Sequence, residues 1–427
     1  MVIVDAALEA RQAAGKPLRV GLVGAGVMGR MIALQFLTPL TGLRLVAVAN
    51  RTLARAQQAY REGGVDTTVT ATSAGALERA IEQNVCAVTD DARLLCEAGN
   101  VDVVIDATGA VEFGAGIALD AIRHRKHVVL VNAELDSTLG PVLKAHADRA
   151  GVVITNTDGD EPGVAMNLLR YLRTLGLRPV AAGNLKGMID VYRTPETQKG
   201  FAEKYGQNPA IVTSFADGTK LAMEETILAN AAGFRVGKRG MYGPKCAHVN
   251  EIAGLLPAEQ MLDGGLVDYA LGAAPYTGAF VVVHEVHPVK QKHLAYLKMG
   301  DGPFYVFYTP FHLPHVQVPS TAARAGLFGD ATTAPLRGPA TEVIAVAKKD
   351  LAKGERLDGV GGFAAYGVIE NSPVVRRDGL LPMGLAEGCV VQRALPKDSP
   401  IRLADVQRPA GRLCDTLYAE QCERFPS

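Results

Sequence analysis

Three glycines near the N-terminus have the spacing of a turn that holds the pyrophosphate of a dinucleotide. Gly24, Gly26 and Gly29 fit the pattern G-x-G-x-x-G. The first permits a tight turn, the second lets a pyrophosphate approach the backbone, and the third lets a helix lie close to the sheet. The amides at the start of that helix would face the anion. We therefore predict cofactor contacts along the whole turn, which comprises Gly24, Ala25, Gly26, Val27, Met28 and Gly29.

The segments on either side of the turn support this prediction. An apolar run at 20–23 precedes it, and apolar residues at helical spacing follow it. The next strand, 43–49, ends in Asn50, Arg51 and Thr52, where contacts to the adenine ribose are expected. An acidic residue there would favour NAD, whereas Arg51 suits the 2′-phosphate of NADP. We predict NADPH as the cofactor; the alternative is that Arg51 is only a solvated cation.

Strand-like and helical runs keep alternating after this point, which predicts an α/β fold, a doubly wound parallel Rossmann sheet, over residues 1–158. Helices are expected at 53–62, 74–83, 117–125 and 139–150, and strands at 101–107, 127–132 and 152–156. Ligands of such sheets lie beyond the carboxyl ends of the strands. The turns after these three strands should therefore share one cleft, and they contribute the further predicted cofactor contacts Thr108, Gly109 and Asn132.

The composition excludes several classes of protein. The 427 residues suffice for two or three domains, and 44 Lys and Arg balance 44 Asp and Glu. No net charge therefore draws the chain to nucleic acid or to a membrane surface. No segment has the roughly 20 apolar residues of a membrane span, and the six cysteines are scattered without C-x-x-C pairs. We expect a cytoplasmic protein that acts on a small molecule.

Beyond residue 158 the pattern changes twice. Residues 159–338 contain strands at 280–283 and 304–308 between longer irregular stretches, which indicates an α+β middle domain that binds substrate. Residues 339–427 contain short strands at 342–347, 368–370 and 389–392 with turns between them and little helical periodicity. This pattern predicts a small, separate and mostly β module.

The last module resembles a SAF domain, a β-clip fold, in the stretches AVAKKDLAKGERL and LLPMGLAEGCVVQRALPKDSPIRLADV. With a Rossmann domain of the homoserine dehydrogenase type and a middle domain containing SFADGTKLAMEE, the chain resembles the 1-deoxy-D-xylulose 5-phosphate reductoisomerase-like family over nearly its whole length. The resemblance implies NADPH-dependent rearrangement of a ketose phosphate, followed by reduction, in the supply of isoprenoid precursors. It also implies a divalent cation, magnesium or manganese.

One position departs from the homoserine dehydrogenases that the first domain resembles. In that family a catalytic lysine follows the strand that ends in VNA, whereas this chain has Glu134 there. A homoserine substrate is therefore disfavoured.

The implied cation would need oxygen ligands, and four carboxylates follow the ends of predicted strands. We predict Glu134, Asp158, Asp160 and Glu161 as its ligands. The competing interpretation is helix capping, because Asp160 precedes Pro162 where a helix is expected to begin.

A second group of ionisable residues lies in 214–229, where a helix is expected to begin after Asp217 as its cap. Lys220 and Glu224 are four residues apart and share a face. An ammonium there suits polarising a carbonyl or donating a proton, and Glu224 suits orienting the lysine or binding the metal. The alternative is a surface ion pair of little consequence. With Lys186, expected after the first turn of the middle domain, these residues are the predicted catalytic set.

A substrate phosphate would need cations. Lys238 and Arg239 lie between two glycines that permit close backbone approach, and Arg193 is the alternative. Each of them is equally well explained as a solvated loop cation. His312 follows an apolar strand and is expected to line the cleft without belonging to the catalytic set.

Three functions remain open from the sequence. The first is the reductoisomerase, and the second is a dehydrogenase of a sugar acid, polyol or hydroxy acid in carbohydrate catabolism. The third is a non-catalytic NADPH sensor whose SAF-like module contacts a partner. Lysines and carboxylates at the cleft favour an enzyme, because a sensor needs no proton donor. Sheet edges in the last two domains lead us to expect a homo-oligomer.

Overall fold

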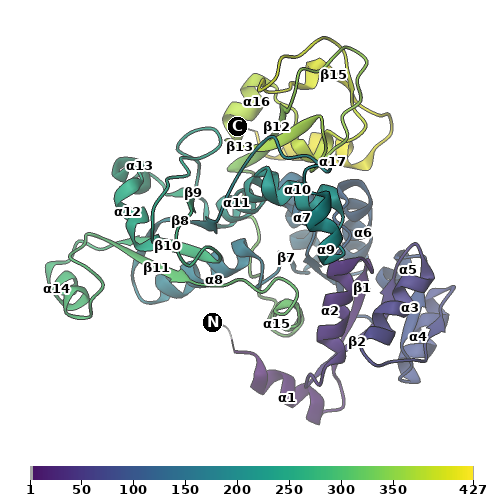
Figure 1. Cartoon of the computed structure of the whole chain (residues 1–427). Helices are drawn as coiled ribbons and strands as arrows, with labels where there is room; N and C mark the ends of the chain where they lie inside the picture. Colours follow the sequence, from purple (N-terminus) through teal and green to yellow (C-terminus); the bar gives the residue numbers. More distant parts are fainter. Residues whose placement is uncertain (1–2, 427) are drawn as a thin grey trace.

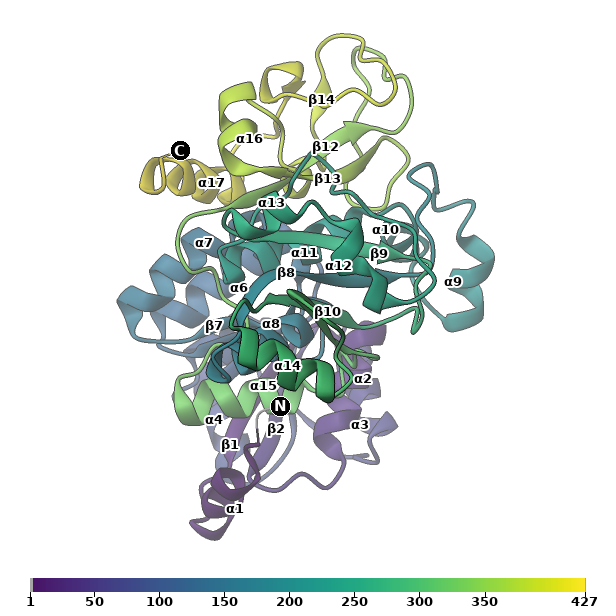
Figure 2. The same cartoon turned by 90° about the vertical axis from the view of Figure 1, so that its left-hand side faces the viewer.

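The computed structural model describes residues 3–426 and has three parts (Figure 1). A large sheet covered by helices lies at the lower right of Figure 1, a second sheet lies to the left, and the C-terminal module, in yellow, lies on top. In the view of Figure 2 the second sheet lies between the other two parts.

The first domain is the predicted doubly wound α/β domain. Its strands are β1 (Leu18–Val23), β2 (Leu43–Ala49), β3 (Val69–Thr70), β4 (Ala87–Thr89), β5 (Val103–Asp106), β6 (His127–Leu130) and β7 (Ile154–Asn156). Its helices are α1 (Asp5–Ala13), α2 (Val27–Leu37), α3 (Leu53–Glu62), α4 (Ala74–Glu82), α5 (Arg93–Glu97), α6 (Val111–Arg123) and α7 (Ala133–Ala150).

The seven parallel strands lie in the order β3-β4-β2-β1-β5-β6-β7. The order reverses at β1, which pairs with β2 on one side and with β5 on the other. Ligands of such sheets bind at this switch point, where the glycine-rich turn follows β1. The strands are apolar runs buried on both faces because helices cover both sides.

Several boundaries differ from those predicted. Helices α6 and α7 begin at Val111 and Ala133, not at 117 and 139, and the short elements β3, β4 and α5 were not predicted. The first turn of each helix, VEFG in α6 and AELD in α7, mixes polar and apolar residues and gives too little apolar periodicity to mark the start. Helix α7 instead begins where its N-cap residue, Asn132, accepts from the Leu135 amide.

The middle domain is built on a four-stranded mixed sheet. Its strands are β8 (Arg178–Lys186), β9 (Leu266–Leu271), β10 (Ala279–His284) and β11 (Phe304–Thr309). Its helices are α8 (Glu161–Thr174), α9 (Lys199–Tyr205), α10 (Pro209–Ala216), α11 (Thr219–Ala232), η1 (Val249–Glu251), α12 (Ile252–Leu255), α13 (Ala258–Leu262), α14 (Pro288–Tyr296), α15 (Val318–Ala323) and the π-helical turn η2 (Arg324–Phe328).

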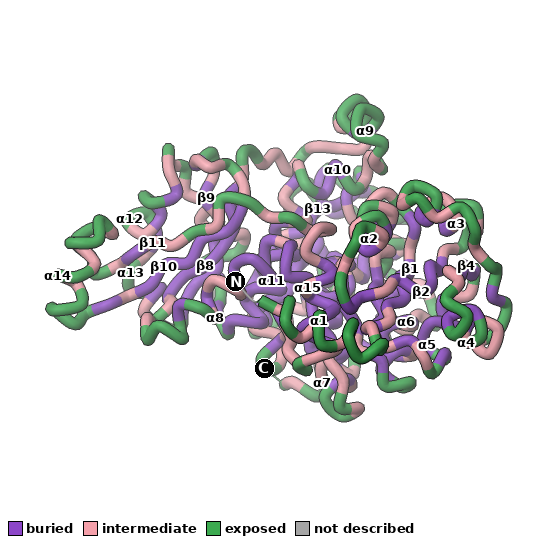
Figure 3. The backbone as a smooth tube through the Cα atoms, turned by 90° about the horizontal axis from the view of Figure 1, so that it is seen from below, coloured by how far each residue is buried: buried purple, intermediate pink, exposed green. Residues whose placement is uncertain are grey.

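The sheet order is β11-β10-β8-β9, with β8 and β9 parallel and the remaining pairs antiparallel. Helices α8 and α11 contact one face, and the segment with α12 and α13 packs on the other. Figure 3 shows β8, β10 and α11 as buried, whereas α9 and α14 are largely exposed. The helix predicted after Asp217 is α11, and Asp217 accepts from the Thr219 amide at its start. The residues before Asp217 belong to a separate helix, α10, and Gly218 turns the chain between the two with a φ of +84°.

Helix α15 returns to the first domain. Val318, Ala322 and Ala323 pack with α2 and with strands of the first sheet. The predicted domain boundaries at 158 and 338 stay predictions, but the chain between them contributes to the cores of two domains.

The C-terminal module contains β12 (Thr341–Ala347), β13 (Ala365–Asn371), β14 (Val390–Val391), β15 (Val406–Gln407), α16 (Ser372–Asp378), η3 (Met383–Leu385), η4 (Leu403–Asp405) and α17 (Leu413–Arg424). Strands β12 and β13 pair with each other, as do β14 and β15. The expectation of little helix is wrong for α17, which packs on α6 and α7 of the first domain.

Helix α17 also supplies hydrogen bonds to α7 where the backbone hydrogen bonding of α7 is interrupted. Pro141 lies inside α7 and has no amide hydrogen to donate. The side chain of Gln421 accepts from the Val142 amide (3.2 Å) and donates to the Thr138 carbonyl (3.1 Å), so it bridges two groups that would otherwise bond directly.

Within residues 3–426 no helix is long and apolar enough to cross a bilayer.

Candidate active site

The glycine-rich turn has the geometry that its spacing predicts. Gly24 has a φ of +101°, and a Cβ there would lie 2.8 Å from the Ala107 carbonyl oxygen. A Cβ on Gly29 would lie 2.0 Å from the Gly24 carbonyl oxygen, whereas one on Gly26 would meet nothing within 4 Å. Helix α2 begins after Gly26 with no side chain capping it. Open space and uncapped amides therefore coincide where a pyrophosphate would bind.

Two predicted contacts near this turn need correction. The Ala25 amide donates to Asn50 Oδ1 (3.0 Å), and Asn50 Nδ2 donates to the Thr52 carbonyl (2.9 Å). Asn50 therefore positions the turn, and the Ala25 amide is not available to an anion. Arg51 and Thr52 are exposed beyond the end of β2, where the ribose of a dinucleotide would lie. Val27 and Met28 form the first turn of α2.

The ends of β5 and β6 are joined by a buried polar network. Asp106 accepts from the Thr108 hydroxyl (2.6 Å) and from Asn132 Nδ2 (2.9 Å). Asn132 Oδ1 accepts from the Leu135 amide and so caps α7. Asn132 is fully buried and committed to these bonds, so its predicted contact with the cofactor is corrected to a positioning role. Gly109 is exposed, with open space where a Cβ would stand.

Beside this edge the structure brings the three predicted catalytic residues together. Lys186 is the last residue of β8. Its ammonium nitrogen lies 2.6 Å from Glu161 Oε2 and 3.3 Å from Glu224 Oε2. Asn184 Nδ2 donates to the same Glu224 oxygen (3.1 Å). The side chains of both glutamates are only 4% exposed. Glu224 is thus a partner of Lys186 inside the protein, and the surface-pair interpretation is wrong.

Lys220 lies in the first turn of α11 and faces the first turn of α7. Its ammonium nitrogen is 3.9 Å from Glu134 Oε1, and its side chain is 13% exposed. Burial alone would lower the pKa of Lys220, but the charges of Glu134, Asp160 and Glu224 outweigh it and raise the pKa. Lys220 therefore stays an ammonium at neutral pH.

Asp160 and His312 complete this group. Asp160 is the N-cap residue of α8, but its side chain makes no capping bond. Burial, with the charge of Glu224, raises the pKa of Asp160, and Lys220 opposes the rise. His312 Nδ1 lies 2.9 Å from the Thr277 hydroxyl and 3.9 Å from Glu161 Oε1. Burial lowers its pKa, so the ring is neutral at pH 7.

We call these seven side chains the lysine–carboxylate cluster: Glu134, Asp160, Glu161, Lys186, Lys220, Glu224 and His312. Four carboxyl groups face two ammonium groups, so the charges do not balance. Burial, with the charge of Glu161, raises the pKa of Glu224 to about 8, against the opposing charge of Lys186. The cluster therefore holds protons at neutral pH that it can exchange with a substrate.

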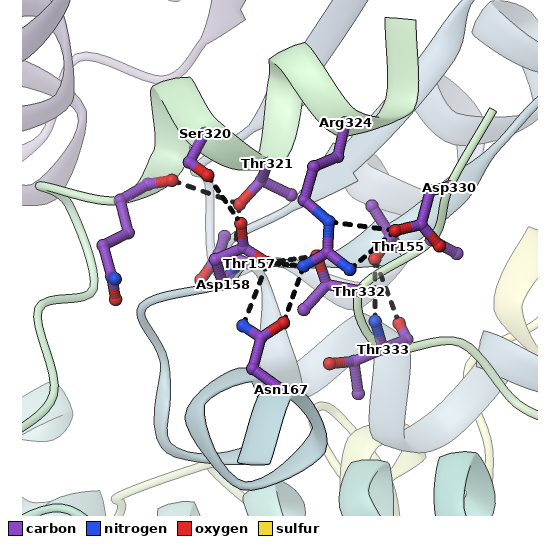
Figure 4. Close-up of polar contacts among 12 residues, drawn as sticks. Thr155, Thr157, Asp158, Asn167, Ser320, Thr321, Arg324, Asp330, Thr332 and Thr333 are labelled. Atoms are coloured by element: carbon purple, nitrogen blue, oxygen red, sulfur yellow. Dashed lines mark hydrogen bonds and ion pairs between the residues drawn. The ribbon is translucent and has the colours of Figure 1, made fainter. Parts of the chain in front are cut away.

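Asp158 does not belong to this cluster (Figure 4). It accepts from Arg324 Nη1 (2.5 Å), from the Ser320 hydroxyl (3.0 Å) and from the Thr332 hydroxyl. Arg324 is 1% exposed and also donates to Asn167 and Asp330. This Asp158–Arg324 network fastens the turn from α15 into η2 to the end of β7.

The predicted metal ligands consequently do not form a site. Asp158 is consumed by Arg324, Glu161 by Lys186, and Glu134 faces Lys220. No group of three or more His, Cys, Asp or Glu side chains in the described part of the chain is placed to hold a metal ion. The donor set does not fit a magnesium or manganese ion, and we derive no step through one.

The predicted phosphate-binding residues lie elsewhere. Arg239 Nε pairs with Glu370 of β13 (2.8 Å), and Lys238 lies over the ring of Tyr242. Both follow the C-terminal end of α11, roughly 20 Å along that 14-residue helix from Lys220. Arg193 pairs with Asp190 (3.0 Å). The phosphate assignment is therefore corrected: Arg239 contacts the C-terminal module, and Lys238 packs on Tyr242 of the middle domain.

Three family models match successive parts of the chain. Residues 20–155 match "Homoserine dehydrogenase, NAD binding domain", 159–318 match "Oxidoreductase DRL, catalytic domain" and 342–407 match "SAF domain". The chain is an NAD(P)-dependent oxidoreductase. Every residue of the lysine–carboxylate cluster except Glu134 falls within the match to the catalytic domain. A search of curated proteins finds no match to the oxidoreductase.

Solved structures similar to the oxidoreductase include several dehydrogenases. A probable dehydrogenase from Thermotoga maritima is 17% identical, with 62% of this chain and 72% of that chain covered and a TM-score of 0.38. A putative myo-inositol dehydrogenase from Sinorhizobium meliloti is 11% identical, with 73% and 90% covered and a TM-score of 0.40. A homoserine dehydrogenase from Thiobacillus denitrificans is 20% identical, with a TM-score of 0.37; the similarity covers 51% of this chain and half of that one.

Proposed function

We propose that the oxidoreductase is a dehydrogenase of a small polyhydroxylated substrate, a polyol, sugar acid or hydroxy acid. The observation that carries the proposal is Lys220, a charged and largely buried lysine at the carboxyl edge of the dinucleotide-binding sheet. Such an ammonium suits the oxygen of a carbonyl that is being reduced, because it can hydrogen-bond the oxygen and then protonate it.

The residues around Lys220 fit the same chemistry. A bound nicotinamide would supply or accept the hydride. The carbonyl oxygen would gain its proton from Lys220, and Asp160 or Glu134 would restore that proton from solvent. Lys186 is held by Glu161 and Glu224, so we assign it to binding a substrate hydroxyl. The neutral ring of His312 would orient a second hydroxyl.

We further propose that the cofactor is NADP(H). Arg51 is exposed where the 2′-phosphate would lie, and no acidic residue stands among Asn50, Arg51 and Thr52 to bond a free ribose hydroxyl. A charge-assisted bond from a guanidinium to phosphate is among the stronger recognition contacts of proteins.

The rearrangement that the reductoisomerase resemblance implies has less support. It requires a divalent cation, and three of the four carboxylates predicted to bind it, Glu161, Asp158 and Glu134, face Lys186, Arg324 and Lys220. A dehydrogenase needs only the proton donor and the dinucleotide. A non-catalytic NADPH sensor would need no proton donor, so it would not explain the buried Lys186 and Lys220.

Turnover of a substrate panel tests the proposal. Polyols, sugar acids and hydroxy acids are assayed with NADP+ and NAD+, their oxidised forms with NADPH and NADH, and dinucleotide absorbance is followed with EDTA present. A separate arm contains 1-deoxy-D-xylulose 5-phosphate with magnesium or manganese. We expect EDTA-resistant turnover of a panel member that Lys220→Met abolishes. Metal-dependent turnover in the separate arm alone would replace the proposal by the reductoisomerase, and dinucleotide binding without turnover in any arm would favour the sensor.

A further inference from the structure

The chain between the two lysines of the cluster is held by the C-terminal module. Residues 187–219 leave the sheet directly after Lys186 and return directly before Lys220. Tyr192 donates its hydroxyl to Asp398 of the module (2.9 Å). A Cβ on Gly361 of the module would lie 1.9 Å from the Ala210 carbonyl oxygen, so the module touches α10 as well.

The closest link is a buried ion pair at the start of α11. Lys348, which follows β12, donates to Asp217 Oδ2 (2.8 Å), and the two side chains are 3% and 0% exposed. The same ammonium donates to the Arg193 carbonyl (2.7 Å) and to the Gly362 carbonyl (2.9 Å). Its three hydrogens thus have three acceptors, and this geometry fixes Asp217 in place.

From Asp217 the link continues to the residue before Lys220. The other carboxylate oxygen, Oδ1, accepts from the Thr219 amide (2.9 Å). The Thr219 hydroxyl accepts from the Gly367 amide of β13 (2.8 Å), and a Cβ on Gly367 would lie 2.9 Å from Thr219 Cγ2. The start of α11 is therefore bonded to Lys348, directly after β12, and to Gly367 in β13, at buried groups.

We propose that Lys348 is a positioning residue for Lys220, and that the C-terminal module is in this way a working part of the active site. The inference rests on the proposed role of Lys220 as proton donor. A buried ion pair adds little net stability over apolar residues of similar size, whereas it imposes one geometry on both partners. That geometry orients the first turn of α11 so that Lys220 faces Glu134 and Asp160.

Three variants separate positioning from stability. Lys348→Met leaves Asp217 buried and unpaired. The double variant Asp217→Leu with Lys348→Met leaves no unpaired buried charge, so we expect its midpoint of thermal unfolding to lie above that of Lys348→Met. It stays below wild type, because the Arg193 and Gly362 carbonyls and the Thr219 amide lose their partners. The control is Lys349→Met, because Lys349 is the next residue and makes only an exposed pair with Glu355 (2.5 Å).

Two readouts are compared on the full chain. Hydrogen–deuterium exchange of a peptide containing Thr219 and Lys220 measures the order of the first turn without requiring turnover. Steady-state kinetics with a substrate from the panel measure kcat and the KM for the dinucleotide. For Lys348→Met we expect faster exchange in that peptide and a kcat roughly 10- to 100-fold lower, with the dinucleotide KM within about twofold.

The double variant decides the outcome. A midpoint above that of Lys348→Met, with kcat still low and exchange still fast, would support positioning. Recovery of kcat in step with the midpoint would overturn it. If Lys348→Met does not fold, the milder Thr219→Val, which removes only the hydroxyl that Gly367 contacts, takes its place with the same expectations. Failure of the proposed function would appear as a wild-type protein without turnover, whereas failure of this inference would appear as unchanged exchange at Thr219 and Lys220.

Discussion

Two buried groups of charged residues lie within a few residues of each other at the end of β7. They differ in how fully their charges are paired and hydrogen-bonded. In the Asp158–Arg324 network, every oxygen of Asp158 is bonded and Arg324 contacts two carboxylates and an amide. In the lysine–carboxylate cluster, carboxyl groups outnumber ammonium groups and the Lys220 pair is 3.9 Å long.

The pKa shifts follow this difference. Burial would raise the pKa of Asp330, but hydrogen bonds from Arg170 and Arg324 bring it below its usual range. In the cluster, burial and like charges raise the pKa of Asp160 and of Glu224. A saturated network fixes one protonation state and one geometry, whereas an unsaturated one leaves protons to be moved.

The largest effect is expected for Lys220→Met. Removal of the proposed proton donor should lower kcat by about 10²–10⁴-fold, because the carbonyl oxygen loses the group that protonates it. The dissociation constant of the dinucleotide, measured by fluorescence titration, should stay unchanged. An unchanged kcat would remove Lys220 from the mechanism.

Arg324→Leu tests how much the Asp158–Arg324 network contributes to stability. It leaves Asp158 buried without its cation and should cost about 3–5 kcal/mol in the free energy of unfolding, measured by urea denaturation. Arg170→Leu is the matched control, because Arg170 bonds the same Asp330 but is 40% exposed, and it should cost less than about 1 kcal/mol. Equal losses for the two variants would contradict the saturated-network interpretation.

Glu224→Gln tests whether the lysine–carboxylate cluster, unlike the Asp158–Arg324 network, makes stability depend on pH near neutrality. The folded protein retains a proton on Glu224 up to about pH 8, whereas the unfolded chain releases it near the ordinary value of 4.5. The folded state therefore binds the extra proton, and stability falls as pH rises between these values. Relative to wild type, Glu224→Gln should gain stability progressively from about pH 5 to pH 8 and no further above it.

Thermal unfolding across that pH range measures the gain. Glu97→Gln, at an exposed position, serves as the control and should run parallel to wild type at every pH. A constant offset for Glu224→Gln would mean that the carboxyl is already ionised in the folded protein.

The smallest effect is expected for Arg51→Ala, which touches neither buried group. Loss of the guanidinium should raise the KM for NADP+ roughly 10- to 100-fold and leave the KM for NAD+ within about twofold. Arg61→Ala, at the far end of α3, is the control. Equal changes for both dinucleotides would show that Arg51 does not select the 2′-phosphate.

Part of the candidate site was predictable because local geometry imposes it. The glycine spacing forces the turn at Gly24, and Lys220 and Glu224 share a helix face wherever that helix lies. The partner of each charged residue was not predictable. Asp158 and Glu161 are three residues apart, yet one meets Arg324 and the other Lys186.

His312 shows what signal was present and what was missing. Its place after an apolar strand indicated the cleft, but its contact with Thr277 and its distance to Glu161 depend on how β11 and α8 pack. Arg239 looked like an anion-binding residue because its partner, Glu370, lies in another domain.

By itself, the sequence determined the parallel sheet, the dinucleotide turn, the order of the three domains and the residue types of the site. These follow from apolar periodicity and from backbone constraints that act within a few residues. Tertiary structure decided which carboxylates face a lysine, which are consumed by Arg324, and that Lys348 fixes the start of α11. Those outcomes depend on burial and on contacts between residues far apart in the chain, such as Asp158 and Arg324, which are separated by 166 positions. No local sequence pattern encodes them.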